Sequence, residues 1–189
     1  MKVFRIPCVC LALCASRLLC QSVDSAVAVK ERNAARILLR VTKENIEDAA
    51  AAMPADKFGF APKDGEFKNV RTFSREVRHL AATNYILAAA ALGEAPPQDA
   101  GDEAGPDSVV TKAQHLAYLH GSYAALERAI DAIPNTRMPV RTSPISPLQG
   151  ETATRESLIM ESIIHSYDHY GQMVVYLRMN GVIPPASRR

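Results

Sequence analysis

The chain has 189 residues, of which 48% are hydrophobic and 22% are charged, an ordinary balance for one soluble domain. The formal net charge is +2, but the chain after residue 22 carries 19 basic and 20 acidic residues. A nearly neutral domain excludes the basic surface of a nucleic-acid-binding protein and any strong attraction to anionic lipid. Abundant alanine and few runs of valine or isoleucine favour an all-α fold.

Residues 1–22 have the pattern of a secretory signal peptide. Lys2 and Arg5 form a positive N-terminal region, an apolar run follows at 6–15, and small residues suited to cleavage come next. We place the cleavage point between residues 16 and 28. The apolar run would span only about 15 Å as a helix, half of a bilayer's apolar core. We therefore expect export to the periplasm or the extracellular space, without stable membrane insertion.

The four cysteines all lie in this leader, at positions 8, 10, 14 and 20. If the leader is removed, the remaining domain has no thiol for a disulfide, for catalysis or for metal binding. A lipid anchor on Cys20 is the alternative to simple cleavage. We favour cleavage, because Leu18 and Leu19 lack the small residue that a lipidation site prefers and Arg17 fits such a site poorly.

The first helix of the domain is expected over residues 28–53, because apolar residues recur there at helical spacing and Pro54 is placed to end it. Its core-facing stripe is expected to contain Ile37, Val41, Ile46 and residues 49–52.

The second and third helices have clear start signals. Thr72 is a suitable N-cap for a helix over residues 73–92, and Gly93 is suited to end it. Thr111 precedes a glutamine at capping-box spacing, so a third helix is expected from there to about Ile133. The stripe of this third helix is expected to be Leu116, Leu119, Tyr123, Leu126 and Ile130.

A fourth helix is expected over residues 153–180, with Gly181 at its end and two prolines beyond. Four amphipathic helices joined by turns of varied length predict a four-helix bundle over residues 28–185.

Three connections join the helices, at 54–71, 94–107 and 134–152. The first carries phenylalanines at positions 58, 60 and 67 that are expected to lie against the bundle, and long ordered loops often cover sites. The second is acidic and rich in proline and glycine, which predicts a mobile, solvated segment. The third contains four prolines and must be a loop.

Histidines give the main chemical signal. His165 and His169 lie one turn apart on the same face of the fourth helix, and such a pair can bind one metal ion. Because cysteine is absent from the mature domain, zinc would need a third nitrogen from another helix. His79, His115 and His120 are the candidates. The last two are five residues apart and are expected at the surface, whereas His79 has apolar neighbours that also suit a buried core histidine.

The sequence HSYDHYGQMVVYLRMNGVIPP at 165–185 resembles the last helix of the DinB-like (damage-inducible protein) superfamily of metal-binding four-helix bundles. The segment FAP at 60–62 followed by VRTFSREVRHL at 70–80 is similar to the start of its second helix, and AAAALGE at 88–94 to the end of that helix.

This resemblance implies that His79, His165 and His169 form a metal triad near one end of an up–down–down–up bundle. Related members act as S-transferases with low-molecular-weight thiols, or as a thiol-dependent isomerase, and the resemblance is also compatible with a homodimer. Three imidazoles leave a coordination position open, where a water can have its pKa lowered towards about 7. Zinc is the first choice of metal, and nickel is the second.

Glu161, one turn before the histidine pair, is expected as a catalytic base or an additional ligand. Further side chains that could orient an imidazole are Glu76, Gln172 and Tyr176.

Three functions compete at this point. The first is a metal-dependent transferase or hydrolase that acts on an unidentified small molecule. Export disfavours the thiol-transferase version, because the thiol cosubstrates of the characterised relatives are cytosolic. The second is a non-catalytic binding module in which the metal acts as a staple between helices. The third is a structural bundle whose histidines are ordinary buried residues.

Overall fold

The computed structural model describes residues 9–97, 100, 103–133, 140, 141, 143–148 and 153–188, with side chains from residue 26 onward. Regular structure in these residues is helical throughout, which confirms the predicted all-α class. The elements in chain order are α1 (Val9–Ala52), η1 (Ala55–Lys57), α2 (Phe73–Leu92), α3 (Lys112–Asp131), α4 (Arg155–Met179) and η3 (Pro185–Arg188).

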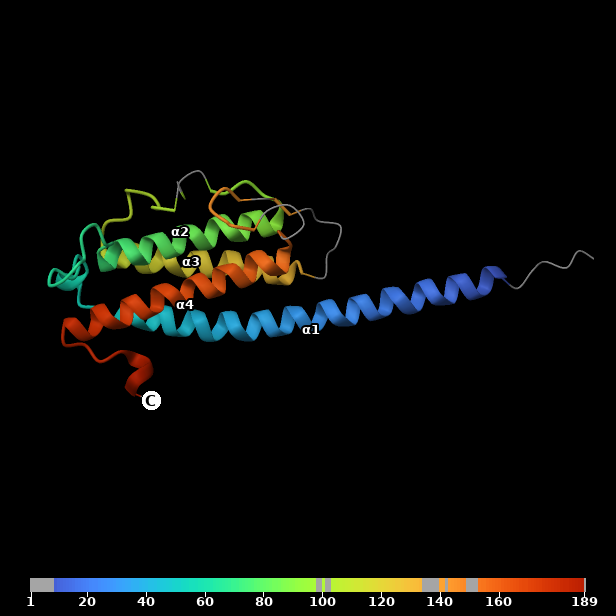
Figure 1. The fold of residues 1–189 in the computed structure, drawn as a ribbon, viewed down its shortest axis with the longest axis horizontal. Coiled ribbons are helices and arrows are strands. Elements are labelled where there is room, and N and C mark those ends of the chain that lie inside the picture. Colours follow the sequence, from blue (N-terminus) through green and yellow to red (C-terminus); the bar gives the residue numbers. More distant parts are fainter. Residues whose placement is uncertain are drawn as a thin grey trace, which may run out of the picture.

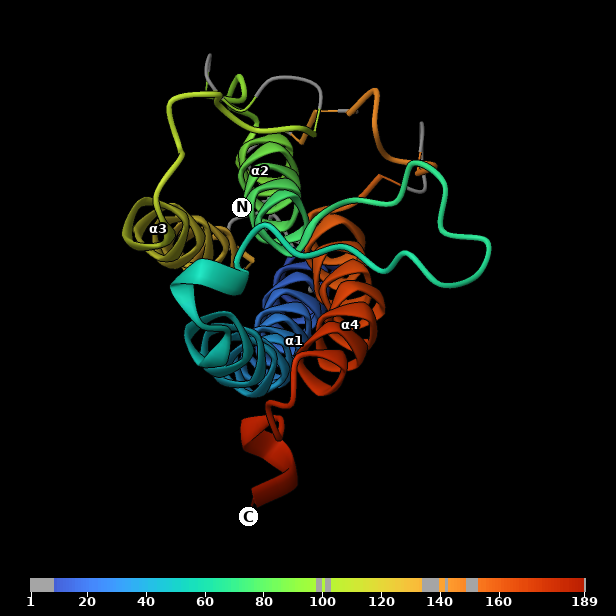
Figure 2. The ribbon, with the colours of Figure 1, turned by 90° about the vertical axis from the view of Figure 1, so that its left-hand side faces the viewer.

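The four α-helices form a bundle in which α2 and α3 run in the same direction and α1 and α4 run in the opposite one (Figure 1). Viewed from its end, the bundle places α2 against α3 and α4, while α1 lies against the same two helices from the other side (Figure 2). This is the up–down–down–up order that the resemblance implied. It makes α2 and α4 direct neighbours, and the three predicted ligands lie on these two helices.

Helix α1 is longer than expected. It begins at Val9 instead of near residue 28, and its N-terminal part extends past the end of the bundle (Figure 1). Residues 1–8 of the predicted leader lie outside the described residues, so the leader and its cleavage stay predictions. No helix in the described part of the chain is both long enough and apolar enough to cross a bilayer.

The predicted core-facing stripe of α1 is partly wrong. Ile37 is 57% exposed and Val41 is 37% exposed, whereas Leu39 and Ile46 are buried. Among the described side chains of this helix, the buried ones are Ala35, Leu39, Thr42, Ile46, Ala49 and Ala50, and Met53 directly after the helix is buried as well. Ile37, Leu38, Leu39 and Val41 lie on different sides of the helix, so the phase of the stripe depends on which side the neighbouring helices approach.

The predicted caps of α2, the predicted start of α3 and the glycine predicted after α4 are confirmed. The Thr72 side chain accepts a hydrogen bond from the backbone N–H of Arg75, and Gly93 closes α2 in the left-handed region at φ 72°. Thr111 forms the expected capping box at the start of α3. Gly181, just past α4, has φ 73°. These signals act locally, which explains why they were legible without the tertiary structure.

The connection after α1 covers the start of α2. Phe58 is buried with its ring edge-on to that of Phe73, and Phe60 is partly buried against Tyr176, as expected. Phe67 is 40% exposed, so the expectation for that ring is wrong. The carbonyl groups of residues 58 and 60 accept hydrogen bonds from the first N–H groups of α2, which have no partner within the helix.

The acidic connection after α2 is not simply solvated, which corrects the expectation for it. Ala100 is fully buried, and the carbonyl groups of Glu103 and Pro106 accept hydrogen bonds from side chains of α2. Because α2 and α3 are parallel, this connection has to return along the bundle, and its described residues 103–106 contact Arg78 and His79 of α2.

Candidate metal centre

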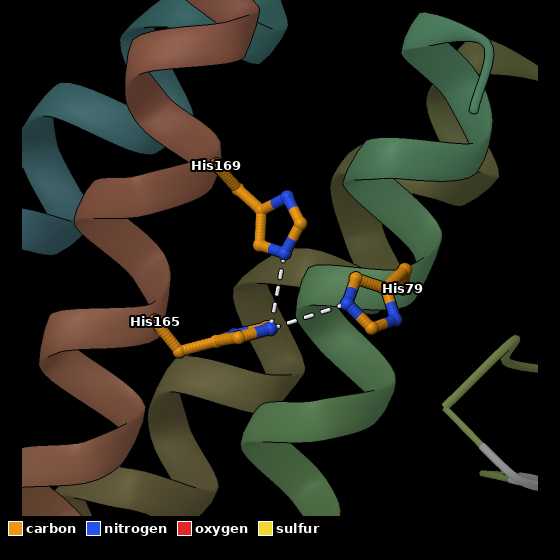
Figure 3. Close-up of side chains that lie close together, drawn as sticks. All are labelled: His79, His165 and His169. Carbon is orange, nitrogen blue, oxygen red and sulfur yellow. Dashed lines mark hydrogen bonds between the residues drawn. The ribbon is translucent and has the colours of Figure 1, made fainter. Parts of the chain in front are cut away.

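Three histidines converge at the seam between α2 and α4 (Figure 3). His79 comes from the second turn of α2, and His165 and His169 come from successive turns of α4. The Nε2 atom of His165 lies 3.1 Å from Nε2 of His79 and 3.0 Å from Nε2 of His169. An ion with nitrogen ligands at about 2.0–2.1 Å holds neighbouring ligand atoms roughly 3.0–3.4 Å apart, so all three rings are within reach of one ion.

The ring of His79 is held by the connection after α2. Its Nδ1 atom lies 2.8 Å from the backbone carbonyl oxygen of Glu103. Glu103 has φ 79°, a left-handed conformation that a residue with a side chain adopts only at a cost of about 1–3 kcal/mol. This unfavourable backbone conformation is what aims the carbonyl group at His79. Nδ1 of His79 is therefore hydrogen-bonded to the carbonyl oxygen, and Nε2 of the same ring faces the other two histidines.

The ring of His169 is held by a carboxylate of α2. Its Nδ1 atom lies 2.6 Å from Oε2 of Glu76, although the two atoms are not aligned as a good hydrogen bond. Glu76 is 2% exposed and His169 is 5% exposed, so this is a close contact between buried groups. Glu76 is one of the side chains predicted to orient an imidazole, and the ring that it contacts is that of His169 on the neighbouring helix.

Burial keeps two of the three imidazoles neutral. Loss of hydration lowers the pKa of His79 to about 4, against an opposing effect of the Glu103 carbonyl, and lowers the pKa of His165 to about 3. The two neighbouring histidines and Arg71 lower the pKa of His165 further. At neutral pH these rings therefore carry lone pairs and no positive charge, the state in which an imidazole binds a metal.

The three Nε2 atoms have too few hydrogens among them to satisfy one another. A carbonyl oxygen only accepts, so Nδ1 of His79 carries the hydrogen and its Nε2 presents a lone pair. Nδ1 of His169 lies 2.6 Å from the Glu76 carboxylate, which repels a second lone pair at that distance, so this ring also carries its hydrogen on Nδ1. Two acceptors thus face Nε2 of His165, which has at most one hydrogen to give, so one buried lone pair lacks a donor. A cation bound by the three Nε2 atoms satisfies them all.

Glu161 and His165 line the same groove, which has a volume of about 450 Å³. The groove is lined mainly by apolar side chains, namely those of Pro147, Leu148, Met160 and Ile164, together with Ser157, Glu161 and His165. Oε2 of Glu161 accepts a hydrogen bond of 2.6 Å from the Ser146 hydroxyl. Among the described residues, the side chains whose ligand atoms could share one metal ion are those of the three histidines, and Glu161 is not among them. Its role as a base stays a prediction.

Two other predicted supporting residues have different roles. The Tyr176 hydroxyl donates to the backbone carbonyl of Arg71 at 3.1 Å, which ties α4 to the segment before α2. Gln172 contacts Asp168 through a long hydrogen bond of 3.4 Å on the exposed face of α4.

The remaining histidines do not join the cluster. His120 is exposed, as expected, and contacts Glu47 at 2.9 Å. His115 is 3% exposed, so the expectation of a surface position is wrong. It stands four residues before Leu119 and therefore continues the buried stripe of α3, where its ring lies edge-on to Phe58 at 5.3 Å.

The sequence analysis missed two contributors to the surroundings of the site. One is the Glu103 carbonyl, for which a backbone conformation set by packing left no signal. The other is a group of arginines, Arg71, Arg75 and Arg78, that lines a pocket beside His79. Their spacing of four and three residues, with a histidine directly after the last, was a readable sign that they share one face of the helix.

Comparison with known proteins agrees with this geometry. A family model described as the DinB superfamily matches residues 38–173, a span that contains all three histidines. No curated protein and no solved structure matches the chain.

Proposed function

The chain belongs to the DinB superfamily, and we propose that it uses His79, His165 and His169 to hold one divalent metal ion that serves a transfer or hydrolysis reaction on a small molecule. The observation that carries the proposal is the convergence of three Nε2 atoms, two of which must present lone pairs. An all-nitrogen ligand set suits zinc first and nickel second.

Such an ion supplies Lewis-acid chemistry, by which a coordinated water or thiol becomes acidic near neutral pH or a carbonyl group becomes more electrophilic. The chain's own groups set the conditions for it. Glu103 and Glu76 contact two of the ligand rings, those of His79 and His169, and burial keeps the rings of His79 and His165 unprotonated. Glu161 is the proposed group that accepts or returns a proton, because it lies one turn from His165 in the same groove.

The groove beside His165 supports a reaction with a small molecule. It is open on one side and mostly apolar, with a few polar groups close to the histidines, which is the usual make-up of a small-molecule site. We further propose that the domain acts after export, which favours hydrolysis over transfer to a cytosolic thiol.

The test is metal content followed by activity. Protein purified without a histidine tag is analysed for metal and is expected to contain about one zinc or nickel ion per chain. Ester and amide hydrolysis and thiol transfer are then screened. His165→Ala and His169→Ala are expected to remove both the metal and the activity. Activity that survives both substitutions would refute the proposal.

The non-catalytic staple is the second candidate, and it rests on the fact that the three ligands join two helices. In that case a chelator lowers the melting temperature sharply while no reaction is found for any substrate tested. Equal melting temperatures with and without chelator would count against the staple.

A further inference from the structure

A second pocket lies beside the proposed metal site, on the Glu103 side of the His79 ring. Its volume is about 180 Å³, which is below the usual range for a whole organic ligand and suits a single chemical group. The residues that line it are Arg71, Arg75, Arg78, His79, Glu103 and Ala104. Three guanidinium groups stand against the carboxylate of Glu103 and that of Asp107, which pairs with Arg78, so this pocket carries a positive charge although the mature domain is close to neutral.

The three arginines are not equivalent. Arg78 is fixed, since its guanidinium donates to the Pro106 carbonyl at 3.2 Å and lies 3.4 Å from Asp107. Arg71 and Arg75 have no ion-pair partner among the side chains that the structure describes. Both therefore have all their guanidinium donors available for an anion that enters the pocket.

The helix itself does not favour positive charge at this place. Arg71 directly precedes the N-cap of α2, and Arg75 and Arg78 stand in its first two turns, where the helix dipole is positive. Like charges three and four residues apart also repel one another. A bound anion would relieve both effects, and the N-terminal end of a helix adds to its attraction.

One wall of the pocket is shaped closely around Arg78. Gly105 has φ 71°, and a Cβ atom at that position would lie 2.7 Å from Cγ of Arg78. A residue with a side chain would push the connection away from the arginine. Glycine therefore lets the backbone of residues 103–106 close over Arg78 and complete the wall.

The pocket adjoins the histidine cluster. His79 belongs to both, with Nε2 towards the other histidines and Nδ1 towards Glu103. Arg71 and Arg75 line the same small pocket as His79. An anionic group in the pocket would consequently lie at the edge of the metal site.

We propose that Arg71 and Arg75 bind the anionic group, a carboxylate or a phosphate, of the small molecule on which the metal site acts, with Arg78 as the fixed wall of this subsite. The assignment of this anion to the substrate rests on the proposed function, whereas anion binding by the arginines does not. The substrate class is thus a small organic anion.

The first experiment measures anion binding without metal. Inorganic phosphate and succinate are titrated by calorimetry into the metal-free full-length protein at low ionic strength. Saturable binding of at least one anion is expected, with affinity about 10-fold weaker in Arg71→Gln or Arg75→Gln and undetectable in the double variant. Arg40→Gln is the matched control, because it removes the same charge from an exposed arginine of α1 that pairs with Glu44, and it should bind as the unaltered protein does.

The second experiment places the anion next to the metal. The protein is loaded with Co²⁺, and the same anion is expected to shift its visible absorption bands. The double variant should bind Co²⁺ normally and show no shift. A failure to bind Co²⁺ or Zn²⁺ at all would refute the proposed function while leaving the calorimetric result on anions intact.

Three results would overturn the subsite. One is the absence of saturable anion binding, and another is equal binding by the double variant. The third is anion binding that appears only after Glu103→Gln, because the pocket's own carboxylate would then already neutralise the two arginines.

Discussion

Two places in this bundle bury histidine side chains, and they do so in opposite ways. At the seam between α2 and α4, three Nε2 atoms face one another and two of the rings are held from behind by Glu103 and Glu76. In the first turn of α3, His115 interacts with its own helix. Its Nδ1 atom lies 2.8 Å from the Thr111 carbonyl oxygen, and its ring lies edge-on to Phe58.

This difference shows that burial alone does not identify a functional histidine. Loss of hydration lowers the pKa of His79, His165 and His115 alike. What separates them is the partner of the second ring nitrogen. The His115 ring lies edge-on to Phe58, whereas Nε2 of His165 lies 3.0–3.1 Å from the Nε2 atoms of His79 and His169, an arrangement that could hold a metal ion.

The strongest way to break this comparison is to remove one histidine from each place. His165→Ala should weaken zinc binding by about 100-fold or more, because loss of even a supporting group typically reduces affinity 10–100-fold. His115→Ala should leave zinc affinity unchanged, although it creates a cavity and lowers stability. Competition with a chromophoric chelator measures both. Equal loss of affinity in the two variants would mean that the cluster is not the site.

The carboxylate behind His169 offers a finer test. Glu76→Gln keeps the shape of the side chain and removes its charge, so zinc affinity should fall about 10–100-fold while helix content stays the same. The matched control is Glu47→Gln, because Glu47 contacts the exposed His120 and should have no influence on zinc. Unchanged affinity in Glu76→Gln would show that the contact does not orient the ligand.

Acid should destabilise the metal-free protein through both places. The folded-state pKa of His79 is about 4, below the ordinary value of 6.5, so the unfolded chain binds the proton first as the pH falls. The free energy of unfolding should therefore decrease from pH 6.5 down to about pH 4, by about 1.4 kcal/mol per pH unit for each such histidine. Urea unfolding across this range in the presence of chelator measures the slope.

The slope also discriminates between the two places. His79→Gln combined with His165→Gln removes two groups with large pKa shifts, so this double variant should flatten the dependence more than His115→Gln does. A stability that is constant between pH 6.5 and 4.5 would contradict the inference that burial keeps these rings neutral.

The smallest expected effect concerns the first turn of α3 by itself. Thr111→Ala removes the capping side chain and should lower the free energy of unfolding by about 1 kcal/mol. Because the backbone carbonyl that binds His115 is retained, the histidine should stay in place. Zinc affinity should be the same as in the unaltered protein, and a measurable change in it would show that the two places are coupled.

Features that depend on neighbouring residues were predictable from the sequence. The caps at Thr72, Thr111 and Gly93 were correctly placed because each acts within about one helical turn. The pairing of His165 with His169 followed from their spacing of four. The choice of His79 as the third member came from the resemblance, since spacing alone left other histidines open.

Features that depend on which side a neighbour approaches were not predictable. Ile37 and Val41 were assigned to the core of α1, and the structure exposes them because α3 and α4 meet the other face. The same reasoning placed His115 at the surface, although its spacing from Leu119 was consistent with burial. The arginine pocket forms only because the connection after α2 folds back on that helix. The acidic composition of this connection, rich in proline and glycine, had predicted a solvated segment instead.

By itself, then, the sequence determined the four helices of the bundle, their ends other than the start of α1, and the chemical types that a metal site requires, because periodicity and capping are short-range properties of the backbone. The tertiary structure alone decided that Glu76 reaches His169 across the seam and that Glu103 turns its carbonyl towards His79. It also placed two arginines beside the cluster without a partner among the described side chains. These contacts join residues far apart in the chain, so they exist only once the helices have packed.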